Sequence, residues 1–303
     1  MHAVHAAPAA AGRFEPILLL LGVGGLIGAL FPVGKLALAA GVAPLGWAIT
    51  VNLGAGLVLA AMAAAQGSAI PVTRAALRYH AVGGLLSMAL PSMILFLVIP
   101  RLGAGLASVV YTLPPLLTLL MAALIGIERP GLRRSLGLAI GLAGAALIVL
   151  PRGALPDGDL LGCMLLAFAI PVSVAAGNIY RTLHWPKGAA PLPLAAGTML
   201  AAGAWVLAAA VASGSAADLL TPLAVPGLAA TQIAASTLQA VLFFRLQKAA
   251  GPVYLSQIGY VATAVGLASG ALAFGETYSP WVWTGAAVIG AGVLTVNSAR
   301  PGT

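Results

Sequence analysis

Long apolar runs, each about the length of a membrane-spanning helix, cover most of the chain. A bilayer core about 30 Å thick needs about 20 helical residues, and ten runs fit this requirement. The runs lack the alternation of a transmembrane β-barrel and are too long for its strands. We therefore predict an all-α polytopic membrane protein with ten transmembrane helices. The runs cover residues 16–40, 45–66, 77–99, 104–127, 132–150, 160–181, 192–213, 225–246, 253–274 and 281–297.

The composition excludes most soluble classes of protein. Hydrophobic residues make up 61% of the 303 residues and charged residues 7%, against about 45–50% and about 25% in soluble domains. So few charges cannot cover a water-facing surface, and the lipid bilayer must surround most of the chain. The net charge of +8 does not indicate a nucleic-acid partner, because the basic residues are scattered in pairs and form no basic face. The single cysteine, Cys163, allows no intrachain disulfide.

The distribution of Lys and Arg predicts the orientation in the membrane. Basic residues concentrate in cytoplasmic loops, and an even number of spans puts both termini on one side. With both termini in the cytoplasm, 11 of the 14 basic residues lie on that side, and the other 3 are Lys35, Arg101 and Arg152. The cytoplasmic residues are then Arg13, Arg74, Arg78, Arg129, Arg133, Arg134, Arg181, Lys187, Arg245, Lys248 and Arg300.

Self-comparison reveals an internal repeat. Five spans precede residues 150–159 and five follow them, so a second copy of the first half enters the membrane in the opposite orientation. We predict one repeat over residues 1–152 and another over 157–303, with the inverted topology typical of secondary transporters. At a shift of 148 residues the matches are Gly103 with Gly251, Ser108 with Ser256, Glu128 with Glu276, Gly137 with Gly285 and Gly144 with Gly292.

These features resemble the drug/metabolite transporter (DMT) superfamily, in its ten-helix EamA-type branch. The resemblance rests on residues 31–35 and 41–45, on 176–181, and on two helix ends with Glu128 and Glu276 followed by glycines. Within that branch the chain is most similar to YddG-type exporters, which implies outward transport of aromatic and other neutral amino acids across a bacterial inner (plasma) membrane. Related proteins often carry Arg early in the second span, where this chain has Val51 and Asn52. The sequence thus does not support a substrate anion held by an Arg there.

No pattern of residues indicates catalysis, a cofactor or a metal. The chain has no HExxH motif, no Cys–His cluster and no P-loop. We therefore predict that it is not an enzyme, binds no cofactor or metal, and does not hydrolyse ATP. Glu128 and Glu276 fall at span ends, which favours a role in packing over proton coupling.

Polar residues inside the spans are the candidates for substrate binding, because such residues are costly in lipid and usually face an interior cavity. Neutral donors and acceptors interleaved with aromatic rings suit a zwitterion with an apolar side chain. The alternative is that these groups form hydrogen bonds between helices. The predicted substrate-binding residues are Asn52, Tyr79, His80, Ser92, Tyr111, Gln232, Ser236, Gln239, Gln257 and Tyr260.

Prolines and tryptophans mark further positions in the spans. Pro32, Pro171, Pro91 and Pro114 interrupt helical hydrogen bonding and are predicted to act as bending points for gating, with static kinks as the alternative. Trp47, Trp281 and Trp283 are predicted to anchor the chain at the membrane surface.

The predicted function is export of small neutral metabolites, chiefly aromatic and other neutral amino acids, by alternating access without ATP. The alternatives are efflux of lipophilic cations, drugs or other metabolites, and a membrane-embedded enzyme or scaffold. Cation efflux usually requires a buried acid, and the spans contain none near their centres. The sequence leaves the oligomeric state open, with a monomer among the options.

Overall fold

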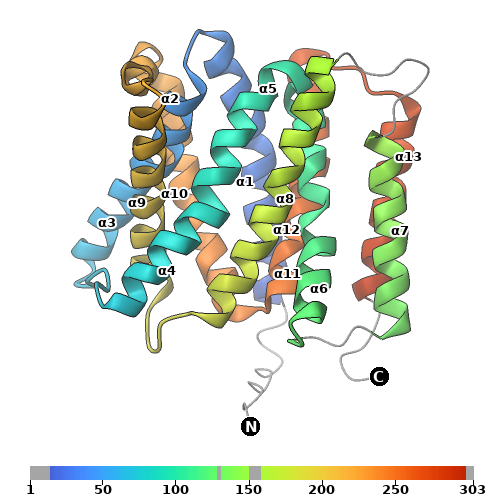
Figure 1. The fold of residues 1–303 in the computed structure, drawn as a ribbon, viewed down its shortest axis with the longest axis horizontal. Coiled ribbons are helices and arrows are strands. Elements are labelled where there is room, and N and C mark those ends of the chain that lie inside the picture. The colour runs from blue at the N-terminus through green and yellow to red at the C-terminus, as the bar shows by residue number, and fades with distance from the viewer. Residues whose placement is uncertain (1–13, 128–130, 150–157, 298–303) are drawn as a thin grey trace.

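The computed structural model describes residues 14–127, 131–149 and 158–297, and throughout these ranges the regular structure is helical (Figure 1). Glu128, one of the two paired glutamates, lies outside them. The long helices run side by side in one bundle. The elements are α1 (Phe14–Ala39), α2 (Pro44–Ile49), η2 (Thr50–Gly54), α3 (Ala55–Ala65), α4 (Arg74–Gly84), η3 (Leu85–Ala89), α5 (Leu90–Val109), η4 (Val110–Thr112), α6 (Pro114–Leu124), α7 (Leu132–Val149), α8 (Gly158–Leu183), α9 (Pro191–Ala212), η5 (Ala216–Ala224), α10 (Pro226–Ala249), α11 (Pro252–Ser256), α12 (Ile258–Phe274) and α13 (Pro280–Asn297).

Seven segments of the described residues are long and apolar enough to cross a membrane, so the chain is a multi-pass membrane protein. One of them, Arg74–Leu124, has 51 residues, which at 1.5 Å per residue is about 76 Å of helix. This length is more than twice the bilayer core of about 30 Å. The chain breaks within the segment at Gly103, whose φ of 77° and ψ of 167° are not helical. A side chain is strained at such a φ, which explains the glycine.

The predicted bending points fall into two groups. Pro32 lies inside α1 and Pro171 inside α8, and both helices continue through them. Pro91 and Pro114 instead lie in the first turns of α5 and α6. Each follows a short stretch of non-α helix, the π-helical η3 before Pro91 and the 3-10 helix η4 before Pro114, and such stretches are common where a helix is locally distorted.

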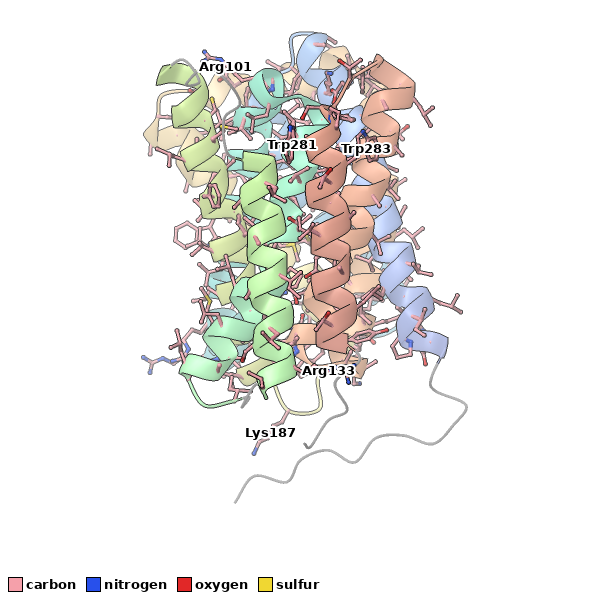
Figure 2. The ribbon with its side chains drawn as sticks, turned by 90° about the vertical axis from the view of Figure 1, so that its right-hand side faces the viewer. Arg101, Arg133, Lys187, Trp281 and Trp283 are labelled. Carbon is pink, nitrogen blue, oxygen red and sulfur yellow. The ribbon has the colours of Figure 1, made fainter. Side chains whose placement is uncertain are left out.

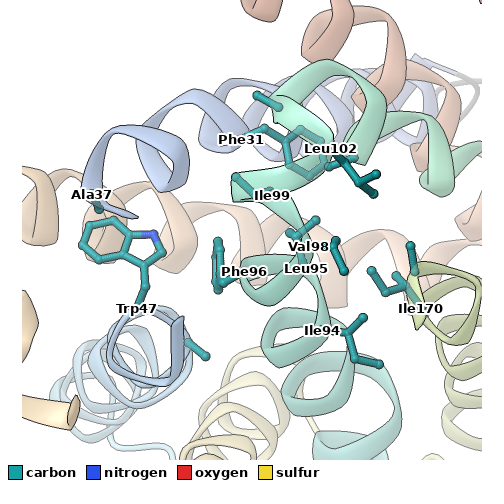
Figure 3. Packing of buried hydrophobic residues seen from close by; sticks show 14 of the residues in the cluster. Phe31, Ala37, Trp47, Ile94, Leu95, Phe96, Val98, Ile99, Leu102 and Ile170 are labelled. Atoms are coloured by element: carbon teal, nitrogen blue, oxygen red, sulfur yellow. The ribbon is translucent and has the colours of Figure 1, made fainter. Parts of the chain in front are cut away.

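The largest apolar core joins α1, α2 and α5 (Figure 3). Trp47 is fully buried in this core, so the prediction that it anchors the chain at the membrane surface is wrong. Gly34 on α1 leaves room for the neighbouring Phe96 ring, since a Cβ at Gly34 would lie 2.9 Å from Phe96 Cε1. Trp281 and Trp283 are each 51% exposed near one end of the bundle (Figure 2), as expected of interface anchors.

The two ends of the bundle carry different charged residues. Figure 2 places Arg101 at one end and Arg133 and Lys187 at the opposite end. The orientation prediction assigned these residues to opposite sides of the membrane in the same way.

Helices α7 and α13 form a close antiparallel pair, seen side by side in both views (Figures 1 and 2). Glycines make this approach possible. A Cβ at Gly144 would lie 2.8 Å from the carbonyl oxygen of Gly285, and a Cβ at Gly292 would lie 2.7 Å from that of Gly137. We call these four glycines the α7–α13 seam. Small residues at such contacts allow helix backbones to approach closely in membranes.

Candidate functional site

The bundle contains a cavity of about 140 Å³, lined by helices from before residue 150 and from after residue 157. A cavity needs a volume of roughly 10–15 Å³ to hold one water molecule, so this cavity is about ten times larger than one water requires. Its wall is mainly apolar, with aromatic rings from Phe31, Phe96 and Phe243. A mostly apolar wall with a few polar groups is typical of small-molecule sites.

Several sequence-predicted residues meet at this cavity. They come from η2, α5, η4, α6 and α10, which are far apart in the chain. Asn52 donates to Ser92 Oγ and to the carbonyl of Ala48, both at 2.8 Å, so this pair links η2 to α5. The predicted residues that line the cavity are Asn52, Pro91, Ser92, Tyr111, Pro114, Gln232 and Gln239.

The other predicted substrate-binding residues do not line it. Ser236 does not line the cavity, and its hydroxyl accepts a hydrogen bond from Nε2 of Gln232 at 3.0 Å. His80 is buried between Thr198 Oγ1 at 3.3 Å and the carbonyl of Pro71 at 3.2 Å. The His80 contacts are hydrogen bonds between segments, as in the alternative interpretation, whereas the Gln232–Ser236 bond lies within α10. The predicted substrate-binding residues outside the cavity wall are Tyr79, His80, Ser236, Gln257 and Tyr260. The predicted bending points outside it are Pro32 and Pro171.

Arg181, near the end of α8, lines the cavity and was not among the predicted site residues. Its side chain is fully buried, although the distribution of Lys and Arg predicts a place for it among the basic residues on the cytoplasmic side. Two contacts orient the guanidinium: Nη2 donates to Asn178 Oδ1 at 2.8 Å, and Nε donates to the carbonyl of Gly177 at 3.3 Å. Its Cζ atom lies 4.7 Å from the centre of the Phe243 ring. The sequence position, two residues before the helix end, gave no signal of this burial.

Three buried polar atoms in the cavity wall have no hydrogen-bond partner among the described residues. They are Nη1 of Arg181, Oγ of Ser87 and one amide atom, Oε1, of Gln232. An unpaired buried polar group costs about 1–3 kcal/mol, and folded proteins contain few of them. The residues that carry these atoms supply a guanidinium, a hydroxyl and an amide to the cavity wall.

A second polar cluster joins α1, the break in α5 and the loop between α12 and α13. The carboxylate of Glu276 accepts hydrogen bonds from Lys35 Nζ, from the Tyr278 hydroxyl at 2.6 Å, and from the backbone N–H groups of Ala104 and Gly105, each at 3.0 Å. Burial alone raises the pKa of Glu276, but these hydrogen bonds outweigh burial and lower the pKa to about 2. We call this group the Glu276 clasp. It holds three segments together, in agreement with the predicted packing role of Glu276.

The described residues contain no group of three or more His, Cys, Asp or Glu side chains able to hold a metal ion. The cavity wall, with one buried cation and several neutral polar groups, is suited to binding an organic molecule.

The fold and the cavity define a polytopic helical membrane protein with an interior cavity. Residues 15–150 match the EamA-like transporter family, whose members are membrane transporters of small molecules. No curated protein matches the chain in sequence. A solved crystal structure of a protein is similar over 94% of this chain and 96% of that chain, with a TM-score of 0.65 and 20% identity. At this identity the likeness extends to the fold alone.

Proposed function

We propose that the chain is a secondary transporter that moves small molecules with an apolar body and a polar end by alternating access, with neutral amino acids as the favoured substrates. The observation that carries this proposal is the cavity, because its wall combines aromatic rings with unpaired polar atoms from both halves of the chain. A site between two halves that rock against each other is the usual arrangement in secondary transporters.

The α7–α13 seam supports a repeat of inverted topology over residues 1–152 and 157–303. Gly144 opposes Gly285, and the residues 148 positions away, Gly292 and Gly137, oppose each other in the same way. Exchanging the two halves therefore maps the seam onto itself, as in a two-fold interface. Because α7 and α13 are antiparallel, this pseudo-two-fold axis lies across the helices, and it would lie in the plane of the membrane.

The same symmetry favours ten crossings with both termini in the cytoplasm. Dividing Arg74–Leu124 at Gly103 turns the seven apolar segments into eight. The pair α7 and α13 adds two more. We place the chain in a bacterial inner membrane with the Lys187 end in the cytoplasm, because that end carries more of the basic residues.

The cavity disfavours lipophilic cations as substrates. Among the described residues, its wall includes the buried cation of Arg181 and no Asp or Glu side chain. A cationic substrate would meet a like charge there, with no acid to pair with it.

Exchange in proteoliposomes tests the proposal. Vesicles are loaded with one unlabelled neutral amino acid, and a labelled one is added outside without an ion gradient. A panel of Phe, Trp, Met, Thr and Ala is tested in turn. Exchange of at least one of them is expected, and no exchange across the panel would contradict the amino-acid assignment.

Two matched variants on α8 link the flux to the cavity. Val174 lines the cavity, whereas Leu165 is 65% exposed on the lipid-facing side. Val174→Trp is expected to abolish exchange by filling the cavity, and Leu165→Trp is expected to leave it within about twofold of wild type, as is usual for surface substitutions. Equal exchange in the two variants would place the transport path elsewhere.

A further inference from the structure

The charge of Arg181 has no partner of opposite sign in the described part of the chain. The ion pair found there joins Lys35 and Glu276, and Arg181 instead contacts one amide oxygen, one carbonyl and the rings of Phe243 and Phe244. A buried cation is normally paired with an acid or with a ligand of opposite charge. The described residues of the cavity wall include no such acid.

The guanidinium is also fixed in orientation before any ligand arrives. Asn178 and the Gly177 carbonyl hold Nη2 and Nε, while the Phe243 ring lies against the charged group. From α4, Gly83 allows the stem of Arg181 to pack closely, because a Cβ at Gly83 would lie 3.1 Å from its Cγ. Nη1 is the atom left unpaired. One face of the cation is thus preorganised for an acceptor.

We propose that Arg181 binds the carboxylate of the transported molecule, so that the cavity selects apolar monocarboxylates, neutral amino acids included. This inference rests on the proposed transport function and names the group that the substrate must carry. A single cation matches a single negative charge, and hydrogen bonds from Arg to a carboxylate are among the stronger ones in proteins. The unpaired Gln232 amide and Ser87 hydroxyl are available to the rest of the polar end, such as an ammonium group. The aromatic rings of the wall face the apolar body.

Four probes with one benzyl-type body separate the contribution of each polar group. L-phenylalanine carries carboxylate and ammonium, 3-phenylpropionate only the carboxylate, phenethylamine only the ammonium, and L-phenylalaninamide an ammonium with a neutral amide. Their dissociation constants are measured by competition against labelled phenylalanine on the purified full-length protein in detergent. The two carboxylate probes are expected to compete, and the other two to compete at least tenfold more weakly.

Arg181→Gln is expected to weaken both carboxylate probes about ten- to hundredfold, the usual loss for a hydrogen bond to a charged group. Binding of the two probes without a carboxylate is expected not to weaken, because the variant also removes the like charge that their ammonium groups would meet. Arg181→Lys keeps the charge and is expected to recover part of the affinity. Lys187→Gln is the control, because Lys187 is an exposed cation beyond the same end of α8.

The outcomes separate this inference from the proposed function. Amino-acid exchange with unchanged affinity in Arg181→Gln would overturn the role of Arg181 and leave the transporter assignment standing. An equal loss for all four probes would also overturn it, because that result indicates a purely structural side chain. Preference of the wild-type protein for phenethylamine would overturn the carboxylate specificity. No exchange and no binding of any probe would overturn both proposals.

Discussion

Lys35 and Arg181 both lie within the helix bundle, but their positive charges have different surroundings. Lys35 meets Glu276 in the Glu276 clasp and lies 4.2 Å from the centre of the Phe274 ring. Arg181 has aromatic neighbours as well, yet no carboxylate within the described residues. The charge of Lys35 is paired within the protein, whereas Nη1 of Arg181 can still donate a hydrogen bond. The comparison teaches that one cation contributes to the fold, whereas the other is held ready for a ligand at a cost in stability.

The largest effect is expected from Glu276→Gln. This change removes the negative charge that faces Lys35 while nearly preserving the side-chain shape. Breaking a fully buried ion pair costs about 3–5 kcal/mol, and we expect about 3 kcal/mol here because Lys35 retains 28% exposure. Equilibrium unfolding in mixed micelles measures the loss. Asp218→Asn is the control, as Asp218 is a half-buried carboxylate outside the clasp, and an equal loss in both variants would contradict the assignment.

The pH dependence of stability is the next effect in size. Because the pKa of Glu276 is lowered to about 2 in the folded chain, its contribution is fully present above the unfolded value of 4.5 and is lost as pH falls towards 2. The lowered pKa corresponds to about 3 kcal/mol, which solvent screening of the partly exposed carboxylate reduces to about 2 kcal/mol. Melting temperatures between pH 7 and pH 2.5 are expected to fall more steeply for wild type than for Glu276→Gln. Parallel curves would show that Glu276 has an ordinary pKa.

Lys35→Met is expected to cost less than Glu276→Gln, about 1–2 kcal/mol, because the carboxylate keeps three other donors. The thioether side chain retains contact with Phe274. The same unfolding experiment ranks the two variants. A larger loss for Lys35→Met would mean that the lysine stabilises the clasp more than the hydrogen bonds from the Ala104 and Gly105 N–H groups do.

Arg181→Met is expected to have the smallest effect on stability and the opposite sign. Removing an uncompensated buried charge is expected to raise the free energy of unfolding by about 1 kcal/mol, since apolar replacements of buried charges are often stabilising. Unfolding without substrate measures this change, and Arg181→Met is expected to abolish binding of L-phenylalanine. A loss of several kcal/mol would show that the guanidinium is a structural element and would remove the contrast with Lys35.

The all-α membrane class followed from run length and composition, because both reflect the thickness and apolarity of the bilayer. The part of the site on Asn52, Ser92, Tyr111 and Gln232 was also predictable, since uncharged polar residues inside apolar runs usually face protein. Which of these residues face the cavity depends on helix rotation and packing, so His80 was not distinguishable from Asn52. Trp47 shows the same limit, because a tryptophan near a span end is equally suited to a core or to an interface.

Arg181 was missed for a different reason. A basic residue at the end of a span is usually solvated, and only the surrounding helices decide whether water reaches it. Here the aromatic pair on α10 and the small residue Gly83 on α4 close over the guanidinium. In the sequence, residues 177–181 supported the family resemblance, but nothing in them indicated a role in binding.

The α7–α13 seam also affects how the chain tolerates mutation. In a pair of separate half-length chains, a substitution at one seam glycine would alter both copies of the contact at once. In the single chain, Gly144→Ala alters one contact and leaves the one between Gly137 and Gly292 intact. Under the proposed repeat, joining the halves in one chain therefore confines each substitution to one contact and allows the two halves to diverge. In that proposal α1 is the counterpart of α8, and α1 contributes no basic residue to the described cavity wall.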